Sequence, residues 1–506
     1  MQVAAGPGFV VQMVNLAARI WTTSAGAPSQ ELQTVGLASL FDVAAGDRLT
    51  DPRVVYDAAS SRWFASISDI DTSSVVLAVS PGPDPTGSWH TYSFAASGCA
   101  DQPRLGLADG VVVLAADVFS SCDNGFAPLL GGELWVANKA QLVAGAAQVA
   151  STSFGPESAL QSLAPVQSLS STATEYAVSV DSPGSRVVHL FAIDGIPPAA
   201  VQVQSVAAPA VSPLSTPPLG AEPATGVGGR QPTIGTNDDR VLDSVWENGK
   251  LWLSANTGCV PSGDAELRAC GRVIELATAT STVDWDTNLS VPGADVFYPA
   301  ISPDGSGNLV VIYGESSAAI LPQLVAVART PAGTFTTPVV IARSAGPYTA
   351  RRFGDYFGAA RDPSRPELVW VAGEQGLALA GTHSWSTTVA SLEMNAVGVP
   401  QPPALSGAAP PRLRAQVVAA RAGARVRLSY KVLDDGAGVR EKVIVSGKKS
   451  VLFGTTTAKG RLHADQVYFV LWHPAKKLRG RFTWCVEAIG SDAQRSAPSC
   501  STVTLR

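Results

Sequence analysis

Histidine and charged residues are scarce in this 506-residue sequence. It has 5 histidines, and only 15% of its residues are Asp, Glu, Lys or Arg. The formal net charge is −5, from 36 basic and 41 acidic residues, which argues against bulk nucleic-acid binding because that activity needs a strong basic surplus. No apolar run reaches the roughly 18–20 residues that a membrane span requires. We therefore expect no nucleic-acid partner and no transmembrane segment.

Signatures of common catalytic sites are absent as well. The sequence has no Gly-x-Ser-x-Gly motif, no Walker-type phosphate loop and no His-Glu-x-x-His motif. It also lacks the Cys-x-x-Cys spacing and the grouped histidines from which zinc sites are built. We therefore expect no metal and no cofactor. Calcium stays an alternative, because Asp69 with Asp71, and the run Asn237-Asp238-Asp239, supply the oxygen ligands that this ion prefers.

Sustained helical periodicity is also rare. Glycine (47 residues) and proline (36 residues) interrupt the chain throughout, and short apolar runs rich in Val, Thr and Ser lie between them. Such runs are typical of β-strands. The 46% content of hydrophobic residues is ample for a buried core. The sequence predicts an all-β protein.

One pattern recurs along the chain: an apolar strand, a turn and a second apolar strand. Clear copies start at residues 53, 104, 243, 298 and 356, with neighbouring gaps of 51, 55 and 58 residues and one double-length gap in the middle. A strand repeat of this length is typical of a closed β-propeller, in which each repeat forms one blade. About 395 residues divided among seven blades gives ~56 residues per blade. We predict seven blades, with six as the alternative.

The repeats end before a proline-rich stretch. We assign residues 1–396 to the propeller, 397–411 to a semi-rigid linker and 412–506 to a smaller module. About six short strands, with clean alternation over Val426–Val432, predict an immunoglobulin-like β-sandwich for this module. Several basic residues cluster in it, which indicates either a solvated face or contact with an anionic surface. They are Arg440, Lys442, Lys448, Lys449, Lys476, Lys477, Arg479 and Arg481.

The six cysteines fall into three local couples, namely Cys99 with Cys122, Cys259 with Cys270, and Cys485 with Cys500. We predict a disulfide in each couple, although six cysteines allow 15 pairings on paper and six buried thiols in a cytosolic protein are the alternative. Disulfides indicate a secreted or cell-surface protein. Residues 1–7 show no basic start and no cleavage site of a signal peptide. We therefore expect either that the export signal was removed or that the start codon was assigned too late.

A resemblance to a known family rests on a few stretches of the first domain. They are residues 51–57 with Arg62-Trp63, residues 84–89, and residues 352–356 with 369–374. Through them, about residues 3–392 resemble the sialidase-like, or BNR-repeat-like, propellers of secreted bacterial proteins. The C-terminal module is similar to fibronectin type III or immunoglobulin-like modules through Trp484–Ala488 and Ser496–Cys500. The Asp boxes of true sialidases are missing, since the nearest approach, Ser302–Ser306, has its glycine out of place and no tryptophan after it.

Arginines recur at the opening of the repeated strand, at Arg53, Arg104, Arg240 and Arg352, with acidic residues beside them. Because the innermost strands of a propeller face its central channel, these side chains would converge and could bind a carboxylate or a sulfated sugar. The resemblance implies Tyr356 as a candidate nucleophile and Asp355 as a candidate acid or base, since sialidases use a tyrosine nucleophile with carboxylate partners. The alternative is structural: ion pairs between neighbouring blades.

The leading hypothesis is an exported, monomeric, non-enzymatic binding or adhesion protein whose propeller presents a ligand face to an extracellular or cell-surface glycan or protein. The absence of a recognisable catalytic set favours it. The alternative is a glycan-processing enzyme, a glycoside hydrolase or lyase of the sialidase-like superfamily, that acts on an anionic sugar. Its centre would hold Arg53, Arg104, Arg352, Asp355 and Tyr356. A structural extracellular module without a small ligand is a third hypothesis.

Overall fold

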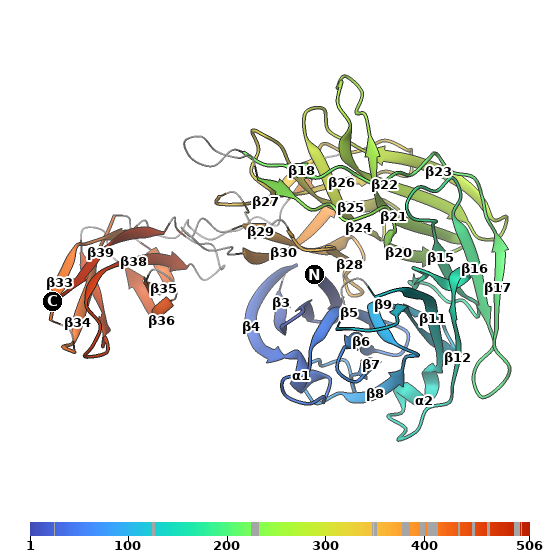
Figure 1. Cartoon of the computed structure of the whole chain (residues 1–506), viewed down its shortest axis with the longest axis horizontal. Helices are drawn as coiled ribbons and strands as arrows, with labels where there is room; N and C mark the ends of the chain where they lie inside the picture. The colour runs from blue at the N-terminus through green and yellow to red at the C-terminus, as the bar shows by residue number, and fades with distance from the viewer. Residues whose placement is uncertain are drawn as a thin grey trace. The chain divides into compact units, whose positions relative to one another are not determined.

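The structure is a computed structural model. It describes residues 1–24, 26–123, 127–223, 232–346, 348, 352–376, 385–394, 400–401, 413–421, 423–433, 436–447, 451–462, 466–489, 496 and 498–506. The chain divides into two compact units, Met1–Pro403 and Ala404–Arg506. Strands make up most of both units (Figure 1), which confirms the all-β prediction.

Helices are few and short among the described residues. They are α1 (Leu37–Leu40), α2 (Lys139–Val143) and the 3₁₀ turn η1 (Ser158–Leu160). None of these described helices has the length and apolar character that crossing a membrane requires.

Most strands of the first unit form four-stranded antiparallel sheets in which strands that follow one another in the chain are neighbours. The first sheet holds β1 (Gln2–Gly6), β2 (Phe9–Val14), β3 (Ala17–Ser24) and β4 (Ala27–Gly36). The second holds β5 (Leu49–Asp57), β6 (Arg62–Asp69), β7 (Ser74–Val79) and β8 (His90–Ala95). A later sheet of this kind holds β24 (Asp295–Pro303), β25 (Leu309–Ser316), β26 (Gln323–Arg329) and β27 (Val339–Arg343). The last one holds β28 (Gly358–Arg361), β29 (Leu368–Gly376), β30 (Trp385–Met394) and β31 (Pro400–Gln401).

The middle of this unit follows the same plan with one departure. Another four-stranded sheet holds β13 (Ala164–Pro165), β15 (Glu175–Ser179), β16 (His189–Asp194) and β17 (Gln202–Ala207). The short β14 (Gln167–Ser168) pairs in parallel with β9 and β20, and so joins two four-stranded groups into one nine-stranded sheet. These groups are β9 (Cys99–Leu107), β10 (Val111–Phe119), β11 (Leu129–Asn138) and β12 (Ser151–Glu157), and β20 (Val241–Glu247), β21 (Lys250–Cys259), β22 (Arg268–Ala277) and β23 (Thr282–Leu289). The proline-rich stretch before β20 contains a small pair, β18 (Gly220–Ala221) and β19 (Thr233–Ile234).

The first strands of the successive groups contact one another in a cyclic order. β1 contacts β5, β5 contacts β9, β9 contacts β13, β13 contacts β20, β20 contacts β24, β24 contacts β28, and β28 contacts β1 again. Figure 1 shows the sheets arranged around this centre. Where the last group meets the first, the Met1 amino nitrogen donates to Tyr356 O at 2.8 Å, and Gln2 Nε2 donates to Phe357 O at 3.4 Å.

Apolar side chains fill the spaces between neighbouring sheets. One buried cluster contains Phe64 and Val75 of the second sheet together with Val112 and Leu114 of the third group. Equivalent clusters lie between each later pair of neighbours. A final cluster joins Val3, Ala5 and Val10 of the first sheet to Trp370 of β29. The core is therefore distributed around the centre, and the last sheet shares its buried surface with the first.

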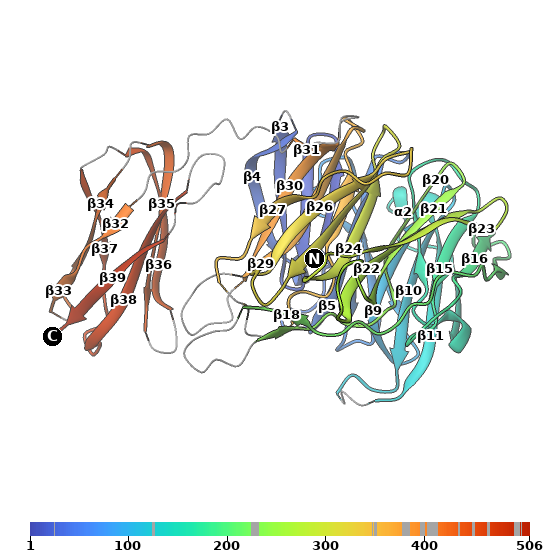
Figure 2. The ribbon, with the colours of Figure 1, turned by 90° about the horizontal axis from the view of Figure 1, so that it is seen from above.

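The second unit consists of two sheets that share one core, and Figure 2 shows them as two layers. The smaller sheet holds β32 (Leu413–Ala415), β34 (Val426–Val432) and β37 (Val467–Trp472). The larger holds β33 (Val418–Ala420), β39 (Ser499–Leu505), β38 (Gly480–Ile489), β35 (Gly436–Ser446) and β36 (Val451–Leu462). Within residues 397–411, the predicted linker, only Pro400 and Gln401 lie among the described residues.

All three predicted disulfides are present, which confirms the pairing. Their S–S distances are 1.97, 1.97 and 2.08 Å for Cys99–Cys122, Cys259–Cys270 and Cys485–Cys500. Cys485 and Cys500 lie directly opposite one another on β38 and β39. The third bridge therefore ties two neighbouring strands of the larger sheet.

The junction of β1 and β28 leads to a stability prediction. A Cβ atom on Gly358 would lie 2.7 Å from Val3 N and 3.2 Å from Gln2 C, so β1 and β28 would have to separate. We expect Gly358→Ala to lower the free energy of unfolding by about 1–3 kcal/mol in urea titrations. Gly36→Ala at the end of β4 is the matched control, because its Cβ would meet nothing within 4 Å. Equal stabilities of the two variants would contradict a tight junction between the first and last sheets.

Candidate functional site

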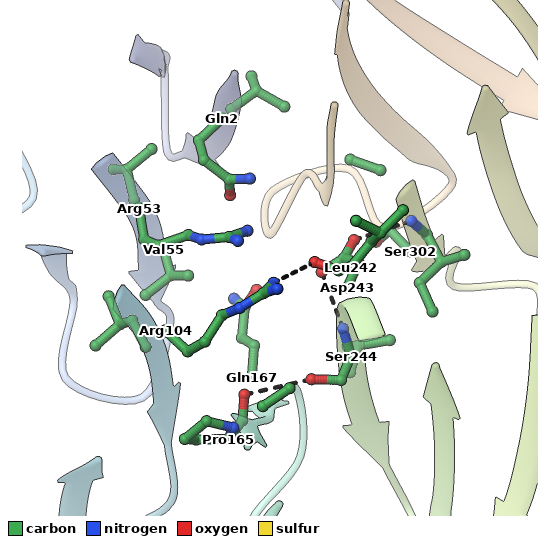
Figure 3. Close-up of a pocket in the computed structure, with 17 residues that line it drawn as sticks. Gln2, Arg53, Val55, Arg104, Pro165, Gln167, Leu242, Asp243, Ser244 and Ser302 are labelled. Atoms are coloured by element: carbon green, nitrogen blue, oxygen red, sulfur yellow. Dashed lines mark hydrogen bonds between the residues drawn. The ribbon is translucent and has the colours of Figure 1, made fainter. Parts of the chain in front are cut away.

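Two of the four candidate arginines meet at the centre of the first unit. Arg53 on β5 and Arg104 on β9 lie side by side and line a cavity of about 50 Å³ (Figure 3). Asp243 and Ser244 of β20 lie across from them. The other polar residues lining the cavity are Gln2, Gln167 and Ser302. Residues far apart in the sequence therefore converge on one small polar space.

Each of these arginines follows a bulge in its strand. Asp51 and Gln102 have φ values of 56° and 52°, a left-handed conformation that is uncommon outside glycine. Each of them precedes a proline, and the pairing registers of β5 with β6 and of β9 with β10 shift at these places. A bulge redirects the side chains next to it. The bulges therefore account for the central direction of Arg53 and Arg104.

A third bulge shows that this feature repeats. Tyr298 has a φ of 55°, precedes Pro299 and marks a register shift between β24 and β25, although Ala300 follows instead of an arginine. In the sequence, the signal is a proline directly before each arginine, as in Asp51-Pro52-Arg53 and Gln102-Pro103-Arg104. Sequence analysis recorded the arginines but missed the bulges that orient them.

Arg104 is fixed by the opposite strand. Its Nη1 and Nη2 atoms donate to Leu242 O at 2.6 Å and to Val241 O at 2.7 Å. Burial, together with the nearby charge of Arg53, lowers the pKa of Arg104 to about 9. Both carbonyls belong to β20, so this side chain connects two strands across the centre.

Only one nitrogen of the Arg53 side chain donates a hydrogen bond to a described residue. Its Nε donates to Pro103 O at 3.4 Å, and its guanidinium carbon lies 4.3 Å from the centre of the Tyr356 ring. Neither Nη atom of Arg53 has a hydrogen-bond partner among the described residues, although only 7% of the residue is exposed. A buried guanidinium with free donors is favourable only if water or an anion satisfies them.

Asp243 is the one carboxylate among the residues that line the cavity. Its Oδ1 accepts from Ser244 N and its Oδ2 from Ile301 N, both at 3.0 Å. Burial raises the pKa of Asp243 above its ordinary value. Two guanidinium groups thus face one carboxyl group that already accepts hydrogen bonds from two backbone amides.

The remaining two candidate arginines make ion pairs outside the cavity lining. Arg240 Nη1 donates to Asp117 Oδ2 at 2.9 Å, and its Nε donates to Asp238 Oδ2 at 2.8 Å. Asp117 lies on β10 and Arg240 directly precedes β20, so the first pair links two groups of strands that are separated in the cyclic order by the sheet of β13. Arg352, with a largely exposed side chain, pairs with Asp355 three residues later.

The candidate nucleophile and its candidate partner do not meet. The Tyr356 hydroxyl lies 3.3 Å from Asp51 Oδ1 and 3.5 Å from Pro52 O, while Asp355 pairs with Arg352. Burial, with the nearby carboxylate of Asp51, raises the pKa of Tyr356 well above its ordinary value. A nucleophilic hydroxyl needs an adjacent base that removes its proton, and the carboxylate within reach of the Tyr356 hydroxyl is Asp51 and not the predicted Asp355. The Tyr356 ring also packs against the guanidinium of Arg53.

The carboxylates considered for calcium are engaged by donors of the protein. Asp69 Oδ1 accepts from Asp71 N, and Asp71 pairs with Arg48 at 2.7 Å. Asp239 accepts from Ser182 Oγ at 2.6 Å and from Gly184 N at 2.7 Å. Within the part of the chain that the structure describes, no group of three or more His, Cys, Asp or Glu residues is placed to hold a metal ion.

Two buried glutamates near Tyr348 were missed by sequence analysis, because nothing in their local sequence distinguishes them. Glu222 Oε2 accepts from Tyr348 N at 2.6 Å, and one carboxyl oxygen each of Glu222 and Glu374 has no partner among the described residues. Burial raises the pKa of Glu374 to about 8 and that of Glu222 to about 7. Both groups therefore hold a proton at mildly acidic pH.

Comparison with known proteins gives no family. No family model and no curated protein matches the chain. The chain is similar to a fungal alcohol oxidase of the AA5 family in complex with copper (12% identity, TM-score 0.42, 99% of this chain and 92% of that chain). It is also similar to a β-fructofuranosidase of glycoside hydrolase family 32 from Bombyx mori (8%, 0.31, 80% and 86%) and to an α-L-arabinanase from Penicillium chrysogenum in complex with arabinobiose (9%, 0.33, 90% and 93%). None of these similarities is strong enough to assign an activity, and the sialidase-like resemblance stays a prediction.

The raised pKa values predict how stability depends on pH. The ordinary glutamate pKa is 4.5, and that of Glu374 in the fold is about 8. Protonated Glu374 therefore favours the fold below about pH 4.5, and this stabilisation is lost as the pH rises to about 8. We expect Glu374→Gln to gain stability relative to the wild type over this range, by on the order of 2–4 kcal/mol, in urea titrations at several pH values. The exposed Glu393→Gln on β30 is the control, and a pH-independent difference between Glu374→Gln and the wild type would contradict the assignment.

Proposed function

We propose that the first unit is a closed seven-bladed β-propeller over residues 1–396. The cyclic contacts of its first strands support this architecture, as do the apolar clusters between all neighbouring sheets, including the last and the first. We propose an immunoglobulin-like or fibronectin type III-like sandwich for residues 412–506. Its two sheets around Tyr430, Trp472 and Trp484 support that assignment.

We propose that this protein is a non-enzymatic binding protein that receives an anionic group at the centre of the propeller. The observation that carries the proposal is Arg53, a residue only 7% exposed, both of whose Nη atoms lack a partner among the described residues. Arg104 adds a second positive charge beside it. Arginine forks match the planar oxygens of carboxylates and the oxygens of sulfate or phosphate.

The size of the cavity limits the ligand. A cavity needs a volume of roughly 10–15 Å³ to hold one water molecule. The central cavity of about 50 Å³ therefore holds a few waters or one small anionic group. A carboxylate, sulfate or phosphate group fits this space, whereas a complete sugar ring is too large. An anionic glycan would therefore insert its acidic group and leave the rest of the sugar outside.

The glycan-processing alternative has less support in the geometry. Glycoside hydrolysis ordinarily uses two carboxyl groups on either side of the bond that is cleaved. The cavity lining contains only one carboxyl group, that of Asp243, whose oxygens accept from two backbone amides, and Tyr356 is buried under Arg53.

The three disulfides support an oxidising location, so we propose a secreted or cell-surface protein that acts on an extracellular ligand.

Titration with small anions tests the binding proposal. At constant ionic strength, we expect sulfate, glucuronate or N-acetylneuraminate to raise the melting temperature in a saturable manner, and a neutral sugar to have no effect. Arg53→Gln should weaken the affinity by about tenfold or more, because the free Nη donors are lost. Arg19→Gln, an exposed arginine on β3 paired with Glu31, is the control and should bind as the wild type does.

Arg53→Lys separates binding from folding, since it keeps the charge but loses the fork, and it should show an intermediate affinity. Saturable anion binding that is unchanged in a folded Arg53→Gln variant would refute an anion site at the centre of the propeller. Turnover of fluorogenic sialosides or uronic-acid polymers would instead establish the enzyme alternative.

A further inference from the structure

The net charge of −5 conceals two oppositely charged units. Residues 404–506 contain 18 basic and 6 acidic residues, a net charge of +12, whereas residues 1–403 contain 18 basic and 35 acidic residues, a net charge of −17. A surplus of this size on about 100 residues creates a strong positive potential. The second unit therefore attracts anionic surfaces that the first unit repels.

The positive charge of the second unit gathers on its smaller sheet and the turns at one end. The segments 413–433 and 466–479, which hold β32, β34, β37, those turns and the short β33 of the larger sheet, contain no acidic residue. Arg414, Arg427 and Lys431 belong to the side of β32 and β34 that alternates with the buried Val426, Leu428 and Tyr430. The turns add exposed cations near the ends of β33, β34 and β37, namely Arg421, Arg425, Lys476, Lys477 and Arg479.

An apolar stripe runs along the same face. Val467, Phe469 and Leu471 on β37 are exposed by 54%, 39% and 45%, while Val470 and Trp472 are buried in the core. The strand register places Leu471 opposite Arg427 and Val467 opposite Lys431. The guanidinium carbon of Arg427 lies 3.7 Å from the centre of the Phe469 ring. Cationic and apolar side chains are thus interleaved on one sheet surface.

This surface lies at the edge of its sheet. β37 pairs with β34 alone among the described strands, so its other edge has no strand partner there. Exposed apolar strands at a sheet edge promote aggregation, and proteins usually protect them with charges or with a partner. Among the described residues, the charges beside the stripe all have one sign, which selects a partner of the opposite sign.

We propose that the outer face of the β32–β34–β37 sheet docks onto an anionic lipid surface. The arginines and lysines would contact the phosphate groups, and Val467, Phe469 and Leu471 would enter the boundary between headgroups and acyl chains. Interfacial binding of this kind combines apolar burial with attraction to anionic lipids. This inference does not depend on the proposed anion site at the centre of the propeller.

Two other occupants explain the face less well. A soluble polyanion would satisfy the cations but would leave the apolar stripe without a role. A second copy of the chain that docked through the same face would bring two positively charged surfaces together, which is unfavourable. An anionic bilayer is the partner that uses both components of the face.

Vesicle flotation with the full-length chain tests the proposal. We expect binding to vesicles of phosphatidylcholine mixed with phosphatidylglycerol, weaker binding in high salt and no binding to pure phosphatidylcholine. The double variant Phe469→Ser/Leu471→Ser should lower the partition coefficient about tenfold or more. Val417→Ser is the matched control, because Val417 is 76% exposed and lies in the loop between β32 and β33. Arg425→Ser/Arg427→Ser should reduce both the binding and its salt dependence.

Three results would overturn the proposal. The first is the absence of binding to anionic vesicles by the folded wild type. The second is equal vesicle binding by Phe469→Ser/Leu471→Ser and Val417→Ser, together with tight binding of both to heparin, which would identify a soluble polyanion as the partner. The third is a dimer in analytical ultracentrifugation that the Phe469→Ser/Leu471→Ser variant abolishes, which would identify a second copy of the chain.

Discussion

The contact between the first and the last sheet of residues 1–403 is the constraint on which the rest of this unit depends. Val3, Ala5 and Val10 share a buried cluster with Trp370, and β1 lies against β28 so closely that Gly358 leaves no room for a Cβ atom. This contact completes the cycle of first strands. The same cycle brings positions 53, 104, 167, 243 and 302 to one cavity.

At the centre of the first unit, backbone groups form hydrogen bonds with buried charged side chains. Arg104 satisfies two carbonyls of β20, and Asp243 satisfies two backbone amides. Both side chains thus meet polar groups that the irregular pairing of the first strands leaves open. Arg53 differs, because its Nη atoms have no partner among the described residues. The distinction separates an arginine that the fold satisfies from one with free donors, although each of the two follows a proline.

Sequence analysis predicted the features that local patterns determine. The alternation of Val426–Val432 predicted β34, and short cysteine spacings predicted all three disulfides. Local patterns do not show that β32 and β33, only two residues apart, belong to different sheets, and the glycines and polar residues of β36 conceal its alternation. Strand pairing across the two sheets decides such cases, and a single strand's pattern does not reveal it.

The candidate site was predictable only in part, for a similar reason. The recurrence of Arg53 and Arg104 at equivalent places indicated that they would meet, whereas the backbone carbonyls that hold Arg104 come from β20, more than 130 residues away. Tyr356 resembled a nucleophile by family pattern, and its burial beneath Arg53 depends on tertiary packing. The basic residues of the proposed docking face were evident in the sequence, whereas the exposed apolar residues beside them depend on the register of β37 with β34.

Diffraction from crystals soaked in bromide tests the central claim most directly, because the anomalous signal locates the anion and the same map traces the strands. The account predicts a closed cycle of first strands in which β1 lies against β28, with a bromide peak within hydrogen-bond reach of the Arg53 Nη atoms. An open row of sheets, or a closed cycle in which Arg53 bonds only to protein atoms and no anion occupies the centre, would contradict it.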